Sequence, residues 1–451
     1  MIVKKFGGTS VGSAKRIQNV AELLINASKT NSSPDLVVLS AMSGTTNSLV
    51  EIAAYLYNHN ADGAKDVIAR LEAKYAKVID ELYSTDEYRS KANEYVQEIF
   101  AYLNTFHKQL FTAKEEKIIL AQGELISTHL MYFYLQEQGV ETYLIPALEF
   151  MKTDLHGEPD SDFIREHLTA ALKVTQEGQT LLDQQPIVIT QGYICMNAHE
   201  EIDNLKRGGS DYTASLVGAA IQAEEIQIWT DIDGMHNNDP RIVEGTKAVR
   251  HLHFEEAAEL AYFGAKILHP TCIQPAKYAN VPVRLLNTMQ PDAPGTLINN
   301  KAEHGTIKAV AAKDNIAAIK IKSSRMLLAH GFLRKVFEIF ESYQTSIDMI
   351  CTSEVGVSMS IDDTSHLNEI IHDLKKYGTV TVDLDMCIIC VVGDMDWENV
   401  GFESKVLAAL KDIPVRMVSF GGSNYNISIL VKEEDRNRAL RALSAEIFGN
   451  A

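Results

Sequence analysis

The sequence predicts an α/β protein with a central, mostly parallel sheet and a helical insertion, followed by two small α+β modules. Three observations lead to this expectation. The N-terminus alternates strand-like and helix-like runs around a glycine turn. Short β-rich runs and amphipathic stretches then continue to about residue 300. Beyond that point, one strand and helix pattern occurs twice.

The N-terminal run indicates a parallel strand–helix–strand unit. MIVKKF leads into Gly7 and Gly8, apolar residues recur at helical spacing from Ile17 to Leu24, and LVVLSA at 36–41 is the next apolar run. Such units bind ligands at the carboxyl ends of their strands. The glycine pair lies at such an end.

The region 61–130 predicts the helical insertion. It has no proline and little glycine, and Val67, Leu71, Tyr75 and Val78 recur at helical spacing. The β-rich runs TYLIPA, PIVIT and IQIWTD follow this region. We therefore expect the first domain to extend over residues 1–300 as one large parallel or mixed sheet with helices.

The C-terminal part contains a repeat. VFEIFESYQTSIDMICTSEVGVSMSI, from Val336, matches VLAALKDIPVRMVSFGGSNYNISILV, from Val406, in its order of helix, strand, turn and strand. We expect two modules, 301–383 and 384–451. Because each is too small to bury a good core alone, the modules should stack on each other or across a subunit interface.

Composition narrows the class of protein. The net charge of −18 argues against a nucleic-acid binder or a protein of acidic membranes. The five cysteines are scattered and odd in number, unlike a disulfide framework, and Cys387 and Cys390 lie in an apolar run typical of core thiols. No run reaches the ~18 apolar residues of a spanning helix, and Met1 leads directly into the glycine motif. A cytoplasmic protein is expected.

KFGGTS, residues 5–10, is the first candidate site. Glycine backbone, Lys5 and two hydroxyls would suit a phosphate at a helix N-terminus, but a tight turn explains the glycines equally well. The stretch lacks the GxxxxGK[ST] spacing of a Walker A loop and the GxGxxG of a dinucleotide fold. Both interpretations stay open from this stretch alone.

Three later stretches also allow two interpretations each. LKRGGSDYTAS, 205–215, combines a helix cap with Arg207, which suits a bidentate carboxylate. IWTDIDGMHNNDPR, 228–241, lacks the ligand spacing of a calcium loop and is either a nucleotide loop or a solvated turn. FGAKILHP, 263–270, holds Lys266, which alone would be a solvated charge near a helix end.

Taken in order, the motifs resemble a known family. KFGGTSVG, LSAMSGTTN, GELIS, KRGGSDYTA, WTDIDGMHNNDPR and FGAKILHP are similar to the aspartokinases of the amino-acid kinase family. The resemblance covers essentially the whole chain, because the C-terminal modules look like the tandem ACT domains of those enzymes. AHGFLRKVFEIF and SIDMICTSEV resemble the lysine-sensitive, monofunctional branch. A bifunctional aspartokinase–homoserine dehydrogenase would need a further domain after Ala451.

The resemblance implies an activity. It is the ATP-dependent phosphorylation of the β-carboxylate of L-aspartate to 4-phospho-L-aspartate, the first step towards lysine, threonine and methionine. A carboxylate is already ionised at pH 7, so the reaction requires positioning and charge neutralisation rather than a general base. The implied cofactors are ATP and Mg²⁺, with the ion held mainly by the nucleotide phosphates and no metal ligands from the protein.

The resemblance also assigns roles to residues. Lys5 matches the lysine between substrate carboxylate and transferring phosphoryl group, and Asp211 the aspartate that holds this lysine. Glu124 matches the acid that meets the α-ammonium of the substrate, and Arg207 the arginine that binds its α-carboxylate. The substrate-binding set is Ser40, Thr46, Glu124, Arg207 and Ser210. The nucleotide-binding set is Lys5, Gly7, Gly8, Thr9, Ser10, Thr230, Asp231, His236, Arg241 and Lys266.

An amino-acid effector site in the first module is implied as well. Its matching residues are Met326, Gly331, Phe332, Leu333, Asp348, Ser353 and Glu354. Three positions depart from the lysine-sensitive pattern: His236 stands where a tyrosine is expected, and Leu328 and Ala329 where a histidine and a serine are expected. We expect feedback inhibition by L-lysine, with threonine as the alternative effector, in a homodimer or dimer of dimers formed through the ACT-like modules.

Two rival functions remain from the sequence. One is another amino-acid kinase, acting on glutamate, acetylglutamate or a uridine nucleotide. The other is a catalytically silent amino-acid sensor that keeps the kinase domain as a scaffold.

Overall fold

The computed structural model describes residues 1–30, 34–108, 110–173, 175–176, 179–180, 186–205, 208–264, 269–323, 326 and 330–449. The chain divides into two compact units. Unit 1 holds Met1–Met235 and Ile267–Asn300, and unit 2 holds His236–Lys266 and Lys301–Ala451. Each unit has a hydrophobic core of its own.

Unit 1 is built on a twisted, mostly parallel sheet, as predicted. Its strands follow the order β12-β11-β9-β1-β2-β6-β3, and every neighbouring pair is parallel except β11 with β12. The parallel pairing of β1 with β2 confirms the expected N-terminal unit. The strand bounds are β1 (Ile2–Phe6), β2 (Asp35–Leu39), β3 (Thr142–Leu144), β6 (Ile187–Gln191), β9 (Glu225–Thr230), β11 (Val283–Asn287) and β12 (Thr296–Asn299).

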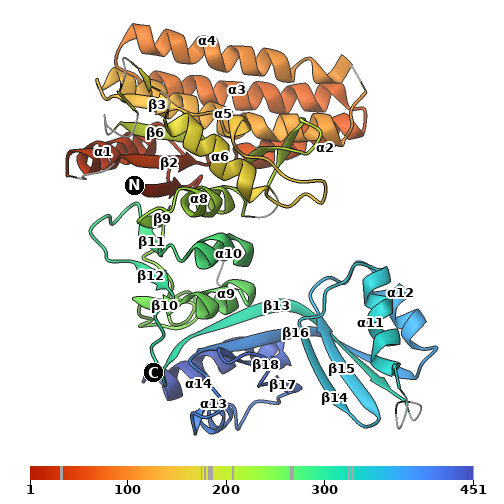
Figure 1. Cartoon of the computed structure of the whole chain (residues 1–451). Coiled ribbons are helices and arrows are strands. Elements are labelled where there is room, and N and C mark those ends of the chain that lie inside the picture. Colours follow the sequence, from red (N-terminus) through yellow and green to blue (C-terminus); the bar gives the residue numbers. More distant parts are fainter. Residues whose placement is uncertain are drawn as a thin grey trace. The chain divides into compact units, whose positions relative to one another are not determined.

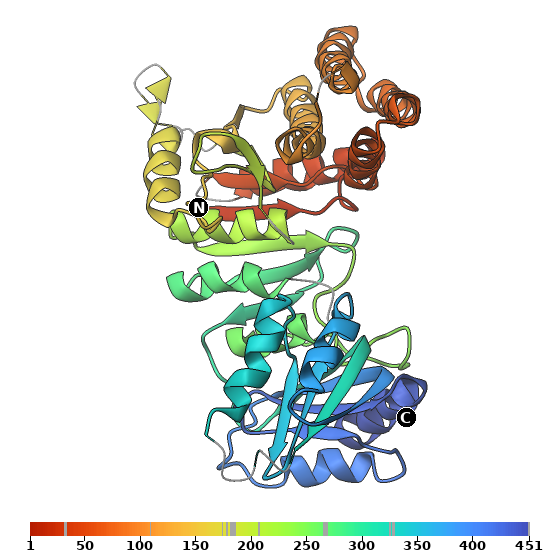
Figure 2. The same cartoon turned by 90° about the vertical axis from the view of Figure 1, so that its right-hand side faces the viewer.

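Helices cover both faces of this sheet. Phe6, Val37 and Ile189 lie in one core cluster with α1–α5, whereas α8 packs on the other face of β1, with α6 and α10 beside it. Figure 2 shows the α2–α5 segment, in red to orange, gathered away from the yellow-green α8. The helix bounds are α1 (Ala14–Thr30), α2 (Thr45–Tyr57), α3 (Ala61–Leu82), α4 (Asp86–Leu103), α5 (Ala113–Glu137), α6 (Ser161–Leu172), α8 (Gly209–Ala220) and α10 (Pro270–Ala279).

The expected helical insertion consists of α3, α4 and most of α5, which lie side by side in Figure 1. Asn60 caps α3 by accepting a hydrogen bond from the backbone N–H of Gly63, and Thr112 forms a capping box with Glu115 at the start of α5. Tyr75 of α3 is completely buried. These caps fix where the long helices begin.

Unit 2 contains one antiparallel sheet that serves two modules. The strand order is β14-β15-β13-β16-β18-β17, and β13 and β16 are long strands that pass from one module to the other (Figure 1). The predicted module boundary between residues 383 and 384 falls inside β16. The strand bounds of this sheet are β13 (Ile307–Lys322), β14 (Met349–Ser353), β15 (Gly356–Ile361), β16 (Thr379–Gly393), β17 (Met417–Ser419) and β18 (Asn426–Lys432). Unit 2 also holds β10 (His251–His253), which is not part of this sheet.

Each module has its own core on one half of the long strands. Ile319 of β13 packs with α11 and α12, and Ile389 of β16 packs with α13 and α14. Cys387 and Cys390 are free and completely buried, which confirms the expectation of core thiols. The helices of unit 2 are α9 (Phe254–Tyr262), α11 (Phe332–Ser342), α12 (Leu367–Leu374), α13 (Phe402–Ala409) and α14 (Arg436–Phe448).

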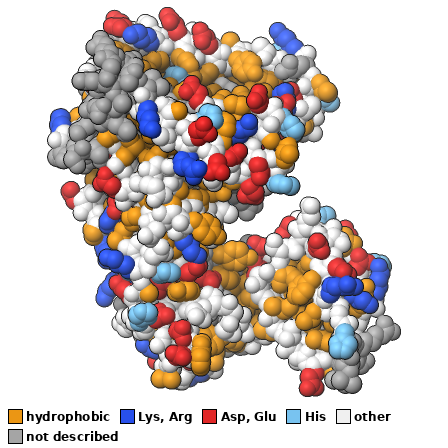
Figure 3. Space-filling view, viewed as in Figure 1, with side chains coloured by type: hydrophobic (Ala, Val, Ile, Leu, Met, Phe, Trp, Pro, Cys, Tyr) orange, Lys and Arg blue, Asp and Glu red, His pale blue; other side chains and the backbone are white. Residues whose placement is uncertain are grey.

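Two features concern the surface. In the described ranges, no helix has the length and apolar content that crossing a bilayer requires. On the face shown in Figure 3, acidic and basic side chains of the described residues are interspersed rather than gathered by sign.

Consecutive lysines of β1 point to opposite faces of the sheet. Lys4 lies on the side of α1–α5, where its ammonium is 2.6 Å from the Asp35 carboxylate of β2, with side chains only 4% and 2% exposed. Lys5 points towards α8. Lys4 is therefore part of the buried framework, and Lys5 is available to the site.

Replacing Lys4 with methionine should destabilise the protein, because Asp35 would keep a buried charge without this partner. We expect Lys4→Met to lower the free energy of unfolding by about 3–5 kcal/mol in urea denaturation. The double variant Lys4→Met/Asp35→Leu should recover most of this loss. Equal stability of Lys4→Met and wild type would contradict the assignment.

Candidate active site

A pocket of about 870 Å³ opens in unit 1 at the carboxyl ends of β1 and β2. Its walls are the turn after β1, the loop between β2 and α2, one face of α5, and the start of α8. The structure brings these predicted site residues together in its lining: Lys5, Gly8, Thr9, Ser40, Thr46, Glu124, Ser210 and Asp211. Segments far apart in sequence thus converge where parallel-sheet topology places a ligand.

Lys5 forms the central ion pair of the pocket. Its ammonium lies 2.6 Å from the Oδ1 of Asp211, and both side chains are mostly buried, 11% and 16% exposed. Asp211 lies in the first turn of α8, whose N-terminus presents free N–H groups and a partial positive charge. The lysine is thereby held at the pocket wall with donor capacity left for a second anion.

Gly8 is required by close packing rather than by flexibility alone. A Cβ at this position would lie 2.8 Å from the carbonyl oxygen of Ala41, and the Gly8 carbonyl accepts a hydrogen bond of 3.0 Å from the Ser43 N–H. The turn after β1 and the loop after β2 are therefore in direct backbone contact. Any larger residue at position 8 would separate the two walls.

Glu124 is a buried carboxylate with one unpartnered oxygen. It is 4% exposed, its Oε1 accepts a 3.2 Å hydrogen bond from the Ala41 N–H, and its Oε2 has no described partner. Burial raises the pKa of Glu124 to about 8, although the bond from Ala41 acts in the opposite direction. A cationic ligand group in the pocket would satisfy this oxygen.

Two other predicted residues near the turn, Gly7 and Ser10, have structural roles. Gly7 leaves room for the lysine, since a Cβ there would lie 3.4 Å from the Lys5 ammonium. The Ser10 hydroxyl is buried and lies 2.6 Å from the Thr288 hydroxyl, which donates to the Thr230 carbonyl. In this structure Ser10 thus supports the turn, and its contact with phosphate stays a prediction. Arg207 and Lys266 lie outside the described residues.

The remaining nucleotide-set residues occupy separate places. Thr230 ends β9 in unit 1 and donates to Asp231 at 3.2 Å. In unit 2, the His236 ring lies 3.1 Å from the Thr246 hydroxyl. Arg241 is 80% exposed, and its guanidinium and its backbone N–H both donate to the carboxylate of Asp239. Their role in nucleotide binding stays a prediction.

Sequence reasoning missed several lining residues. Tyr193 and Leu205 flank the hairpin of β7 (Ile194–Met196) and β8 (Ile202–Asn204), Asn204 ends β8, and Asn47 lies in α2. Tyr193 has a φ of +68°, rare for an aromatic residue, and its N–H donates to the Thr213 hydroxyl. No sequence signal marks an aromatic residue for this conformation.

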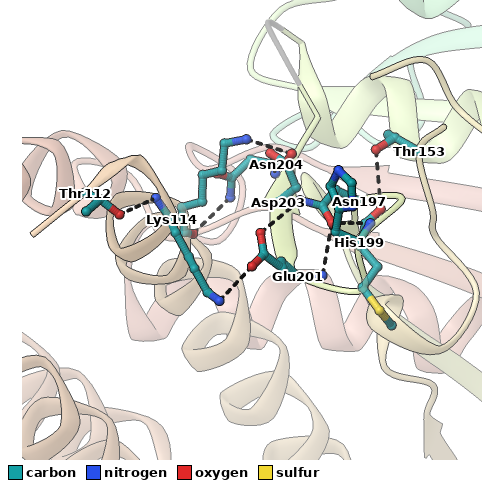
Figure 4. A network of polar contacts seen from close by, with 10 residues as sticks. Thr112, Lys114, Thr153, Asn197, His199, Glu201, Asp203 and Asn204 are labelled. Atoms are coloured by element: carbon teal, nitrogen blue, oxygen red, sulfur yellow. Dashed lines mark hydrogen bonds and ion pairs between the residues drawn. The ribbon is translucent and has the colours of Figure 1, made fainter. Parts of the chain in front are cut away.

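Two ion pairs tie the hairpin to α5, which also carries Glu124. Lys114 pairs with Glu201 and Lys117 with Asp203, both at 2.7 Å. Figure 4 shows Lys114 reaching Glu201 and the hairpin turn folded around the Asn197 side chain. The helix and the hairpin therefore position their pocket residues together.

The predicted effector residues described in unit 2 gather around the start of α11 and along β14. Gly331 caps α11 with a φ of +81°, Phe332 and Leu333 pack in the first-module core, and Glu354 is exposed. Asp348 is fully enclosed: its carboxylate accepts from Lys313 at 2.9 Å and from the Tyr262 hydroxyl at 3.0 Å. Leu328 and Ala329 lie outside the described residues. Effector binding stays a prediction.

Comparison with known proteins identifies the family. The model of the amino acid kinase family matches residues 1–287, and that of the ACT domain matches residues 389–447. Aspartokinase 2 of Arabidopsis thaliana chloroplasts is 32% identical over 99% of this chain and 84% of its own length. The chain belongs to the aspartokinases, within the amino acid kinase family. Lysine-sensitive aspartokinase 3 of Escherichia coli is 30% identical, with 99% of both chains covered.

Solved structures of aspartokinases agree with this assignment. E. coli aspartokinase III in complex with aspartate and ADP (R-state) has a TM-score of 0.80 at 30% identity, covering 99% of this chain and 100% of its own. The same enzyme with lysine and aspartate (T-state) has a TM-score of 0.77 at the same identity, with 99% of each chain covered. The predictions of an aspartokinase enzyme and of its kinase fold followed by an ACT domain are confirmed.

The pKa of Glu124 implies a pH dependence of stability in the ligand-free protein. The folded state holds this proton up to about pH 8, whereas the unfolded chain releases it near 4.5, so stability present at low pH is lost as pH rises through this window. We expect Glu124→Gln to flatten the decline in unfolding free energy, measured by urea titration at several pH values. Identical slopes for variant and wild type would contradict this.

Proposed function

We propose that this aspartokinase transfers the γ-phosphoryl group of ATP to the β-carboxylate of L-aspartate in the pocket around Lys5. The observation that carries the proposal is the combination, in one pocket, of the Lys5–Asp211 ion pair with the unpartnered carboxylate oxygen of Glu124. A phosphoryl transfer between two anions needs a cation between them, and an amino acid needs an acceptor for its ammonium.

The reaction balances without a general base. A β-carboxylate oxygen attacks the γ-phosphorus, the new O–P bond forms as the bond to the bridging oxygen breaks, and ADP leaves with that electron pair. Lys5 contacts the carboxylate and the transferring phosphoryl oxygens and reduces their repulsion. Asp211 fixes the lysine on the wall that both anions face.

Phosphates would lie against the turn after β1. Gly8 and Thr9 line the pocket there, and phosphate oxygens would accept hydrogen bonds from the backbone N–H groups of this turn. Among the described residues that line the pocket, Asp211 of α8 is already paired with Lys5 and Glu124 is assigned to the α-ammonium, so a magnesium ion fits best through the phosphates themselves. When bound, magnesium neutralises part of the phosphate charge.

The aspartate backbone would lie towards α5. Glu124, as a carboxylate, accepts the α-ammonium, and the hydroxyl-bearing residues Ser40, Thr46 and Ser210 line the same space. Arg207 is proposed to bind the α-carboxylate. Because burial raises the pKa of Glu124 to about 8, binding of the ammonium at neutral pH releases a proton from this group.

Feedback inhibition by lysine is the proposed regulation. The ACT match and the lysine complex of E. coli aspartokinase III support it. So does the position of Asp348, which contacts both Lys313 of β13 and Tyr262, the last residue of α9. A cationic effector that competes for Asp348 would disturb the contact with α9.

Trapping the acyl phosphate tests the catalytic proposal. With ATP, magnesium, aspartate and hydroxylamine, the wild type should form aspartyl hydroxamate, and Lys5→Ala should lose about 100-fold or more of this rate, because the cation between the anions is gone. Failure of well-folded wild type to form the hydroxamate would refute the function. Undiminished turnover by Lys5→Ala would refute the role of the lysine.

Two carboxylates that share Lys313 provide a matched test of regulation. Millimolar lysine should lower the wild-type rate by about fivefold or more, and Asp348→Asn should weaken this response. Asp362→Asn is the control, because Asp362 also lies 2.9 Å from Lys313 but is 43% exposed. If neither lysine nor threonine changes activity or thermal stability, the effector proposal is wrong.

A further inference from the structure

The loop between β2 and α2 supplies a continuous part of the pocket wall. Ser40 through Gly44 of this loop line the pocket, together with Thr46 and Asn47 in the first turn of α2. On the inner side it is held by Gly8, whose carbonyl accepts from the Ser43 N–H, and by Ser127 of α5, whose hydroxyl donates to the Ser40 carbonyl at 2.7 Å. Neither of these two contacts reaches Gly44, and the turn around Gly44 is bound by residues of α3.

Two adjacent residues of the helical insertion reach this turn. The Lys74 ammonium donates to the Ser43 carbonyl at 2.7 Å, and the Tyr75 hydroxyl lies 2.9 Å from the Thr45 hydroxyl. Gly44, between these two attachment points, has a φ of +80° and precedes the first turn of α2. The turn is therefore fixed on both sides of its left-handed residue.

The two attachments differ in exposure: the contact between Tyr75 and Thr45 is buried, whereas the bond from Lys74 to Ser43 lies at the surface. Tyr75 and Thr45 are completely buried, and the Tyr75 ring packs against Phe100 of α4 with ring centroids 6.0 Å apart. Partial burial of Lys74 lowers its pKa. Its bond to the Ser43 carbonyl is short and charge-assisted, and such bonds are stronger than those between neutral groups.

Lys74 itself does not line the pocket, because Ser43 and Gly44 stand between its ammonium and the pocket space. A role as a direct ligand of the substrate is therefore not what its contacts support. Its contact fixes the backbone of residues whose neighbours, Ser40 and Thr46, face the pocket.

We propose that Lys74 and Tyr75 are positioning residues for the acceptor amino acid, which make the helical insertion a working part of the kinase site. The inference rests on the proposed function, since it takes the occupant of this part of the pocket to be aspartate. It assigns to the insertion the task of holding the loop in the shape that presents its hydroxyls. The nucleotide end of the pocket lies at the turn after β1, which meets this loop through the Ser43 N–H, whereas Lys74 and Tyr75 bind the loop at the Ser43 carbonyl and at Thr45.

The chain offers a matched control for the lysine. Arg70 lies one helical turn before Lys74 on α3 and pairs with Glu51 of α2 at 3.3 Å, with both side chains exposed. It joins the same two helices without touching the loop. Arg70→Ala therefore removes a cation and an α2–α3 contact, and leaves the attachment at Ser43 intact.

The kinetic test compares Lys74→Met, Lys74→Arg and Arg70→Ala in the full chain. Lys74→Met should raise the KM for aspartate about tenfold and leave the KM for ATP within about twofold, because only the loop loses a charged hydrogen bond. Lys74→Arg should restore most of the aspartate KM, and Arg70→Ala should match the wild type. Tyr75→Phe, which removes only the hydroxyl, should change the same KM in the same direction but less.

Hydrogen–deuterium exchange of residues 40–47 gives a second readout that needs no turnover. Exchange there should be faster in Lys74→Met than in wild type and Arg70→Ala. Wild-type kinetics and exchange in Lys74→Met would overturn the inference, as would equal increases in both KM values. If the wild type formed no aspartyl hydroxamate, the proposed function would fail, and the exchange data would still decide whether Lys74 holds the loop.

Discussion

The ion pair between Lys5 and Asp211 is the interaction around which the pocket of unit 1 is arranged. It joins Lys5, near the end of β1, to Asp211 in the first turn of α8. The ion pair thus connects two of the segments that line the pocket. The neighbouring lysine, Lys4, lies on the other face of the strand and has a different role. Lys4 and Lys5 differ by one position, which places them on opposite faces. The ion pair of Lys4 with Asp35 is buried in the core, whereas the ion pair of Lys5 with Asp211 lines the pocket.

Glu124, in the same pocket, is buried without a full set of hydrogen-bond partners among the described residues. A buried carboxylate with an unpartnered oxygen is unfavourable for the ligand-free fold, since desolvation opposes its ionisation. Glu124 lines the same pocket as Lys5 and Ser210. In the proposed function, the ammonium of the substrate would pair with this oxygen and relieve the unfavourable burial, which would favour its binding.

The sequence predicted the elements that depend on local pattern. The strand-like run MIVKKF, the helical spacing from residue 61 onwards and the C-terminal repeat all correspond to observed strands, helices and modules. The family resemblance of the ordered motifs predicted several residues that the structure brings together in one pocket. The sequence could not predict that Ser10 bonds Thr288, or that Asp348 is enclosed by Lys313 and Tyr262. Those contacts join residues far apart in sequence, and no local pattern encodes them.

Lys74 and Tyr75 illustrate the limit most clearly. On an amphipathic helix, Tyr75 falls on the apolar face and Lys74 at its border, so their pattern predicts only a core aromatic and a surface charge. In the folded chain both polar tips meet the turn around Gly44, because α3 packs against α2 where that turn begins. Residues at the edge of the apolar face of a helix can thus have a functional role that no sequence motif indicates. The insertion therefore has to be considered with the glycine turn and α8 as a third support of the same pocket.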